Sequence, residues 1–96
     1  MTATPTVNSP QPNQWRAAVS RLLKSEMSKR GIRYEDLSQR LAAIGTQQSA
    51  VNLRNKINKG ILGADLLLQI ILVLNVSRIE RETILDILSE LGCEIN

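Results

Sequence analysis

Histidine and phenylalanine are missing from this 96-residue sequence, and tryptophan, tyrosine and cysteine each occur once. Without histidine there is no Ser-His-Asp triad, no histidine metal ligand and no histidine general base. The single cysteine, Cys93, excludes an intramolecular disulfide and a cysteine-based metal site. Acidic residues do not cluster with metal-ligand spacing, and the glycines are scattered singly, so no phosphate-cradling loop is present. These absences argue against an enzyme and against a bound cofactor or metal.

Long apolar runs are missing as well. No stretch approaches the ~20 apolar residues that a membrane span needs. The N-terminus lacks the charged region and following apolar run of a secretory signal. We therefore expect a cytoplasmic protein with no membrane partner, in which a disulfide between two copies of Cys93 is not expected. The chain is long enough for one domain. Because aromatic residues are scarce, aliphatic side chains must fill the core of that domain.

Charge is divided unevenly along the chain. Residues 1–60 carry ten basic side chains against three acidic ones, whereas residues 61–96 carry two basic side chains against six acidic ones. No acidic residue occurs between Asp36 and Asp65. Such asymmetry suggests that one half of the chain meets a polyanion and the other does not. The alternative is two solvated faces of unequal charge.

Prolines separate the first residues from the rest. Residues 1–13 contain Pro5, Pro10 and Pro12 among small polar residues, with Val7 as the only branched aliphatic. Such a segment cannot bury enough apolar surface to offset its ordering entropy, so we expect a flexible tail. Residues 14–96 are expected to form the folded domain.

Within that domain, apolar residues recur at steps of three and four in five segments. The predicted helices span residues 13–30, 34–43, 47–59, 64–75 and 78–91. Asn13, Thr46 and Ser77 are the expected N-caps of the first, third and fifth helices, and Glu80 completes a capping box with Ser77. Gly45 supplies a tight turn. The pattern predicts an all-α bundle of five helices.

The helix over 64–75 is apolar nearly all round and must therefore be covered on most sides. So many aliphatic residues in so short a chain predict a patch that remains after the domain has folded. A homodimer through the C-terminal helices would bury this patch and set two recognition helices about one DNA turn, roughly 34 Å, apart.

The second and third helices, with their glycine turn, have the outline of a helix-turn-helix. The expected apolar brace between them consists of Leu37, Leu41, Ile44, Ala50, Leu53 and Ile57. The opposite face of the third helix is polar and basic, as entry into the major groove of DNA requires. The alternative is that this face is only solvated, but an ordinary solvated face mixes charges of both signs.

The candidate DNA-binding residues follow from this winding. Those expected on base edges are Gln48, Asn52, Asn55 and Lys56. Those expected on phosphates are Arg54 and Lys59, together with cations of the first or the second helix. Gln47 and Ser49 lie at the predicted helix start, where they could either assist phosphate binding or serve only as caps.

The run RYEDLSQRLAAIGTQQSAVNLRNKINKGILGADLLLQIILVLNV, residues 33–76, resembles the lambda-repressor and Cro-like helix-turn-helix family. The resemblance lies in Leu41-Ala42, Gly45, the polar helix ending at Lys59-Gly60, and the apolar segment over 66–76. It implies sequence-specific duplex DNA binding, usually as a dimer, in bacterial or phage transcriptional regulation. It also implies that Arg33 and Arg40, at or in the second helix, contact the DNA backbone; the alternative is that both are only solvated. Two features depart from the family: the spacing from the leucine-alanine pair to Gly60 is about two residues longer, and Asn58-Lys59 replaces the glutamate that often precedes the closing Asn-Gly.

A second resemblance covers residues 15–60. The runs Glu26-Met27, Lys29-Arg30-Gly31 and NLRNKI, residues 52–57, are similar to an uncharacterised bacterial domain family of the same type.

Two other functions remain open. The aliphatic helices over 64–75 and 78–91 could serve an adaptor or antitoxin-like module that binds a protein partner. RNA binding is a third possibility, but the scarcity of aromatic residues argues against single-stranded RNA. Trp15 could stack on a base, although its place on an apolar stripe favours core packing.

Overall fold

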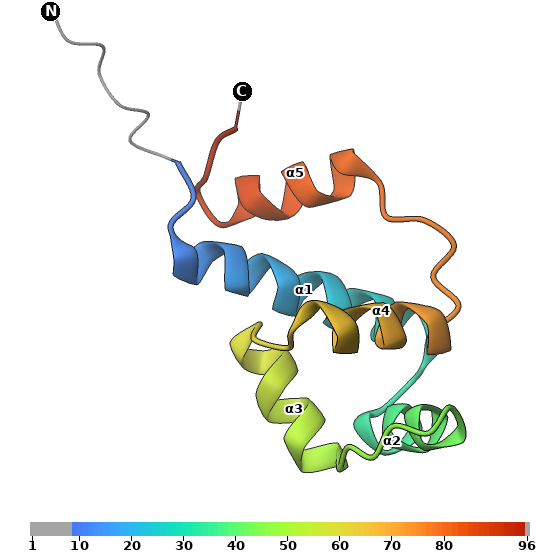
Figure 1. Cartoon of the computed structure of the whole chain (residues 1–96). Helices are drawn as coiled ribbons and strands as arrows, with labels where there is room; N and C mark the ends of the chain where they lie inside the picture. Colours follow the sequence, from blue (N-terminus) through green and yellow to red (C-terminus); the bar gives the residue numbers. More distant parts are fainter. Residues whose placement is uncertain (1–8, 96) are drawn as a thin grey trace, which may run out of the picture.

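The computed structural model describes residues 9–95, which fold into five helices (Figure 1). The helices are α1 (Pro12–Arg30), α2 (Tyr34–Ala43), α3 (Ala50–Lys59), α4 (Ala64–Val73) and α5 (Arg81–Glu90). This part of the chain contains no strand, so the predicted all-α, five-helix fold is confirmed. Residues 1–8 of the predicted tail lie outside the described residues.

α1 begins one residue before the predicted start and takes in the last two residues of the predicted tail. Pro12 occupies the first turn, where its fixed φ suits a helix and its missing N–H leaves no donor unsatisfied. Gln11, rather than Asn13, is the N-cap, and its backbone N–H donates to the Oε1 atom of Gln14 at 2.8 Å. The C-terminal end at Gly31 is as the sequence predicts.

α3 begins later than predicted, at Ala50, so residues 47–49 belong to the turn. The N-cap is Ser49, whose Oγ accepts the backbone N–H of Asn52 at 3.0 Å. The predicted cap, Thr46, is wrong because its hydroxyl forms a tertiary hydrogen bond with the side chain of Gln69 on α4. The roughly two residues by which this segment exceeds the lambda-repressor and Cro-like spacing therefore lie in the turn between α2 and α3.

The boundaries of α4 and α5 also differ from the prediction. α4 ends at Val73, and Asn75 follows with a left-handed φ of 59°. α5 begins at Arg81 with Glu80 as its N-cap, so the predicted capping box starting at Ser77 is wrong. Residues 76–80 are not helical because α5 packs on α1, and the chain must cross from α4 to reach it (Figure 1).

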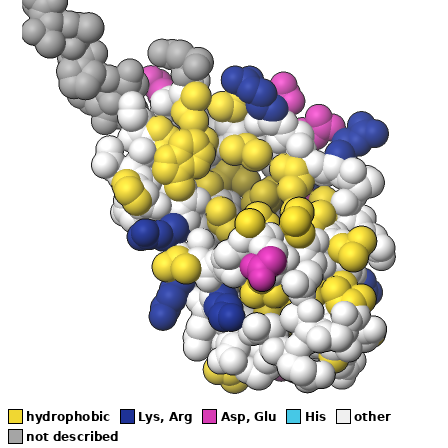
Figure 2. Space-filling view, viewed as in Figure 1, with side chains coloured by type: hydrophobic (Ala, Val, Ile, Leu, Met, Phe, Trp, Pro, Cys, Tyr) yellow, Lys and Arg dark blue, Asp and Glu magenta, His cyan; other side chains and the backbone are white. Residues whose placement is uncertain are grey.

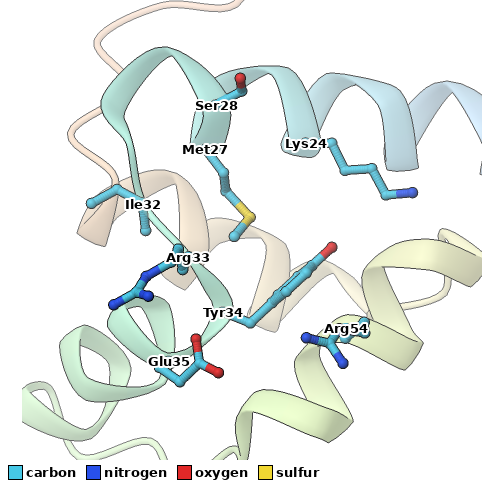
Figure 3. Close-up of a pocket in the computed structure, with 8 residues that line it drawn as sticks. All are labelled: Lys24, Met27, Ser28, Ile32, Arg33, Tyr34, Glu35 and Arg54. Atoms are coloured by element: carbon cyan, nitrogen blue, oxygen red, sulfur yellow. The ribbon is translucent and has the colours of Figure 1, made fainter.

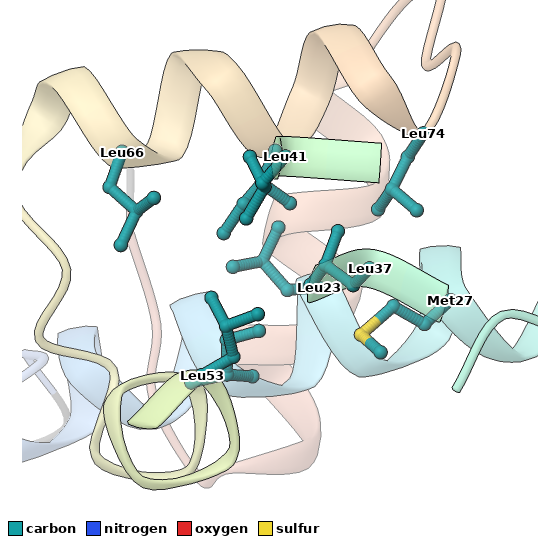
Figure 4. Close-up of a cluster of buried hydrophobic side chains, with 9 residues drawn as sticks. Leu23, Met27, Leu37, Leu41, Leu53, Leu66 and Leu74 are labelled. Carbon is teal, nitrogen blue, oxygen red and sulfur yellow. The ribbon is translucent and has the colours of Figure 1, made fainter. Parts of the chain in front are cut away.

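The main core lies where α1, α2, α3 and α4 meet (Figure 4). Its buried members are Leu23, Met27, Leu37, Leu41, Leu53, Ile57, Leu66, Ile70 and Leu74. Aliphatic side chains supply all of it apart from one methionine, as the composition predicts. Ile44, expected in the brace between α2 and α3, lies outside this core with 47% of its surface exposed. The left-handed turn at Gly45 directs the chain away from the core immediately after it.

A second, smaller core joins α5 to α1. Ala18, Leu88 and Cys93 are buried there together. At the edge of this contact an Arg21 Nη1 atom lies 3.6 Å from Oε1 of Glu90. Cys93 is therefore a packing residue in the described part of the chain.

One buried acid on α1 is neutralised within its own helix. Glu26 accepts a hydrogen bond from Nη1 of Arg30 at 2.7 Å, and Nζ of Lys29 lies 3.5 Å from its other oxygen. Burial alone would raise the pKa of Glu26, but the Arg30 hydrogen bond and the Lys29 charge outweigh burial and hold that pKa below its ordinary value. This carboxylate is thus an ion-pair partner in α1.

Gly60 fixes how α3 sits against α1. Its φ of +67° is left-handed, and a Cβ atom built there would overlap the backbone carbonyl of Arg16 on α1. Only glycine allows the two backbones to approach so closely. The end of α3 is therefore held against the first turns of α1.

We predict that Gly60→Ala destabilises the fold much more than Gly31→Ala. Gly31 has a nearly identical φ of +64° but nothing within 4 Å of an added Cβ, so it reports the backbone strain alone. The Arg16 overlap should add roughly 1–3 kcal/mol to the loss in unfolding free energy, which is the usual cost of overpacking. Urea unfolding followed by circular dichroism measures both variants. An equal loss for the two would show that the α1–α3 approach is not a constraint.

Candidate nucleic-acid interface

α3 turns one face into the core and the opposite face outward. Leu53 and Ile57 are fully buried against the other helices. Asn52, Asn55 and Lys59, which wind to the opposite side of the helix, are exposed. The structure thus brings together three of the predicted DNA-binding residues on one accessible surface, which we call the α3 face.

Two further residues of the α3 face were missed by the sequence reasoning. Val51, near the start of α3, has 62% of its surface exposed, and Asn58, about two turns later on the same side, is exposed as well. The helical winding places both on this side, but a valine has no hydrogen-bonding group that would mark it in the sequence. A valine methyl group is a suitable contact for the methyl group of thymine.

The predicted residues before Ala50 do not follow the helical winding, because they lie in the turn. Gln48 is half-buried there: its carbonyl accepts the hydroxyl of Ser38 on α2 at 2.6 Å, and its Oε1 accepts Nζ of Lys56 at 3.3 Å. Gln48 and Lys56 therefore form a pair at one flank of α3. Gln47 is exposed in the turn, and the hydroxyl of Ser49 is engaged in capping α3.

The two predicted phosphate contacts from α2 are both exposed but both have intramolecular partners. Arg33 is the N-cap residue of α2, and its Nε lies 3.6 Å from Oδ2 of Asp36. Arg40 donates from Nη1 to the carbonyl of Val73 at 2.8 Å, which ties α2 to the end of α4. Arg40 is thus first a link between helices.

Arg54 occupies the other flank of α3, above the ring of Tyr34, with 5.4 Å between its Cζ atom and the ring centroid. Beside it lies a depression of about 350 Å³ between α1, α2 and α3 (Figure 3). Lys24 and Met27 of α1 line this depression together with Tyr34. Tyr34 was not singled out from the sequence, and Lys24 was covered only by the general expectation for helix-one cations, since the proximity of both to Arg54 depends on the packing of three helices.

The cations of α3 are not paired with acidic side chains in the described part of the chain. Within residues 9–95, no carboxylate lies at ion-pair distance from Arg54, Lys56 or Lys59, and α3 itself contains no acid. The α3 face is therefore basic and rich in amide side chains. This combination allows hydrogen bonds to base edges and attraction to phosphates.

A second surface is apolar. Leu68 and Leu72 of α4 are 67% and 66% exposed, on the one stripe of this helix that the rest of the domain leaves uncovered. Next to α5 a groove of about 180 Å³ is lined by Trp15, Ala18, Val19, Leu22, Ile84 and Ile87. Trp15 is 45% exposed at this groove, so the prediction that it packs in the core is wrong. In Figure 2 apolar side chains gather around a hollow on the side of the molecule that carries α4 and α5.

Two general features limit the kinds of site that the described residues offer. Among the helices of residues 9–95, none has the length and apolar character to cross a membrane. The same residues hold no group of three or more side chains suited to a metal ion. The candidate binding surfaces are the α3 face, the depression beside Arg54 and the apolar surface.

Fold and surface together define a small all-helical domain with one basic polar face and one apolar face. Residues 15–79 match the family described as a domain of unknown function, DUF6471. This match covers more than half of the chain, so the chain belongs to that family. No curated protein and no solved structure shows significant similarity to this chain.

Proposed function

We propose that this protein binds double-stranded DNA through the α3 face and acts as a sequence-specific transcriptional regulator in the cytoplasm. The observation that carries the proposal is the orientation of α3. Leu53 and Ile57 fix one side of the helix in the core, which leaves Asn52, Asn55 and Lys59 exposed on the other. An α-helix presented in this way fits the width of the major groove.

The side chains of the α3 face suit both parts of DNA recognition. Asn52 and Asn55 offer paired donors and acceptors, which asparagine uses on adenine. Lys56, Lys59 and Arg54 supply charge for phosphates or guanine. Gln48 adds a side-chain amide from the turn before α3, where its Oε1 accepts a hydrogen bond from Nζ of Lys56.

The sequence resemblance to lambda-repressor and Cro-like proteins supports the same function. That resemblance rests on the segment from α2 to α4, which contains the turn at Gly45 and the end of α3 at Gly60. The match to DUF6471 is compatible with it but assigns no activity. The DNA proposal therefore rests on the chemistry and placement of α3.

We predict that the protein binds duplex DNA with a strongly salt-dependent affinity and that Asn55→Ala/Lys56→Ala binds at least about tenfold more weakly. If about four phosphates are contacted, affinity should fall on the order of 10²-fold between 50 and 200 mM salt, because the basic side chains of the protein displace counterions condensed on the DNA. Fluorescence anisotropy with labelled duplexes measures both quantities.

The matched control is Arg81→Ala. It removes one positive charge, as the double variant does, but from α5, and it should bind DNA like the wild type. Circular dichroism confirms that each variant is folded. The proposal is contradicted if the wild type shows no binding even at low salt, or if the two variants lose affinity equally.

The apolar surface supports a second part of the proposal, a homodimer through the C-terminal helices. Leu68 and Leu72 lie one helical turn apart on α4 and form an exposed ridge. The groove beside Ile84 and Ile87 of α5 provides a hollow of matching apolar character. A two-fold dimer needs a self-complementary surface of this kind. It would place two α3 helices on successive turns of DNA, about 34 Å apart.

We predict that the wild type sediments as a dimer at tens of micromolar and that Leu68→Glu/Leu72→Glu is monomeric at that concentration. Two carboxylates on the ridge would have to lose water in the interface, which is unfavourable. Ile44→Glu, at an exposed apolar residue in the turn after α2, is the control and should remain dimeric. Sedimentation equilibrium distinguishes the states. A monomeric wild type would overturn the dimer but not the DNA proposal.

The same apolar surface favours one alternative function, an adaptor or antitoxin-like module that binds another protein. Exposed leucines such as Leu68 and Leu72 are typical of protein interfaces. This alternative predicts association that is insensitive to salt and is lost in Leu68→Glu/Leu72→Glu, whereas Asn55→Ala/Lys56→Ala leaves it unchanged. The two variants thus separate the two functions.

A further inference from the structure

The depression beside α3 gathers side chains from three helices. Lys24 comes from the middle of α1, Tyr34 from the first residue of α2 and Arg54 from α3. Figure 3 shows the phenol ring of Tyr34 projecting into the space between α1 and α3, with Lys24 on one side and Arg54 on the other. The side chain of Met27, which is buried, forms an apolar wall behind the ring.

Three polar groups of this depression have no hydrogen-bond or ion-pair partner among the described residues. Within residues 9–95, Lys24 and Arg54 have no carboxylate at ion-pair distance, and the Tyr34 hydroxyl makes no hydrogen bond. Arg33 also lines the space, but its guanidinium points away from Tyr34 in Figure 3 and lies beside Asp36. The depression thus offers two cations and one hydroxyl donor.

Net charge indicates which ligand fits. Three cations, Lys24, Arg33 and Arg54, line the depression. Two carboxylates oppose them: Glu35 in the lining, and Asp36, which is paired with Arg33. The balance is a single positive charge, which matches the single negative charge of a phosphodiester. The apolar wall excludes water from one side and therefore strengthens the attraction to an anion.

We propose that Lys24, Tyr34 and Arg54 together bind one phosphate group, which in the working complex is a backbone phosphate of DNA. The inference rests on the proposed function, because it uses the entry of α3 into the major groove. Arg54 lies on the flank of α3, where one wall of that groove runs. The cation–π contact fixes the Arg54 guanidinium over one side of the Tyr34 ring, while Lys24 lies on the other side, so a phosphate at the edge of the ring can reach both cations.

The shared chemistry is a phosphate oxyanion, which a free phosphate ester also carries. The experiment therefore has two arms. The first is anisotropy of duplex DNA across a salt series with Lys24→Gln and Tyr34→Phe, with Lys29→Gln as control. Lys29 lies on the same helix but is paired with Glu26. The second is NMR titration of the protein with inorganic phosphate and with adenosine monophosphate.

For the DNA arm, Lys24→Gln should lower affinity about three- to tenfold and reduce the salt slope by about one, because one phosphate contact is lost. Tyr34→Phe removes a neutral donor, so it should lower affinity about threefold with an unchanged slope. Lys29→Gln should bind like the wild type. A merely structural role for Lys24 or Tyr34 would not divide the slope and the affinity in this way.

The outcomes separate the sources of the phosphate. If DNA binds and both variants behave as expected, the backbone phosphate stands. A free phosphate ester is the ligand if adenosine monophosphate shifts the Tyr34 ring saturably and Lys24→Gln abolishes this shift, while the DNA arm fails. The DNA arm fails if the wild type does not bind DNA or if the variants bind DNA normally. If the variants bind DNA normally and no phosphate shifts Tyr34, the site is overturned.

Discussion

The burial of Leu53 and Ile57 is the contact on which the arrangement of the domain depends. Both side chains are fully enclosed where α1, α2 and α4 meet α3, and the buried side chains around them are aliphatic apart from Met27. Because a helix that buries one stripe must expose the other, this packing determines what α3 presents to solvent. The polar character of the α3 face follows directly from it.

Both ends of α3 are held as well. At the N-terminal end, the hydroxyl of Ser38 binds the turn through the carbonyl of Gln48, and Ser49 caps the helix. At the C-terminal end, Gly60 lies against the backbone of Arg16. A recognition helix needs a rigid mounting, because base contacts depend on side chains placed within a fraction of an ångström. These restraints supply such a mounting for the proposed DNA contact.

The domain presents two different surfaces. α3, with its amides and cations, and α4, with exposed Leu68 and Leu72, both pack on the main core, whereas the small core around Leu88 attaches α5 to α1. The charge division in the sequence has the same order, since most acids occur after residue 60. The proposed DNA binding and the proposed self-association would therefore use different faces of one small domain.

The helices themselves could be predicted from the sequence, because aliphatic spacing and the glycines at 31 and 60 are local signals. Helix starts were less predictable. Thr46 and Ser49 are both suitable caps, and the hydrogen bond from Thr46 to Gln69, which is distant in sequence, decides between them. Periodicity likewise shows that α4 is apolar but not what covers Leu68.

The candidate site was predictable only where it lies on one helix. Asn52, Asn55 and Lys59 share a face that winding alone defines, and the structure places them there. Gln48 departed from the winding because it belongs to the turn. The meeting of Lys24 with Tyr34 could not be read from spacing, since it depends on how three helices pack.

The most direct test of the account is an NMR titration of the isotope-labelled protein with a short duplex DNA, followed at each backbone amide. The account predicts that the largest shifts fall on residues 47–59, with smaller ones around Tyr34, and that the amides of α5 facing solvent do not move. Shifts confined to α4 and α5, or no shifts at low salt, would contradict the assignment of α3 as the DNA-binding element.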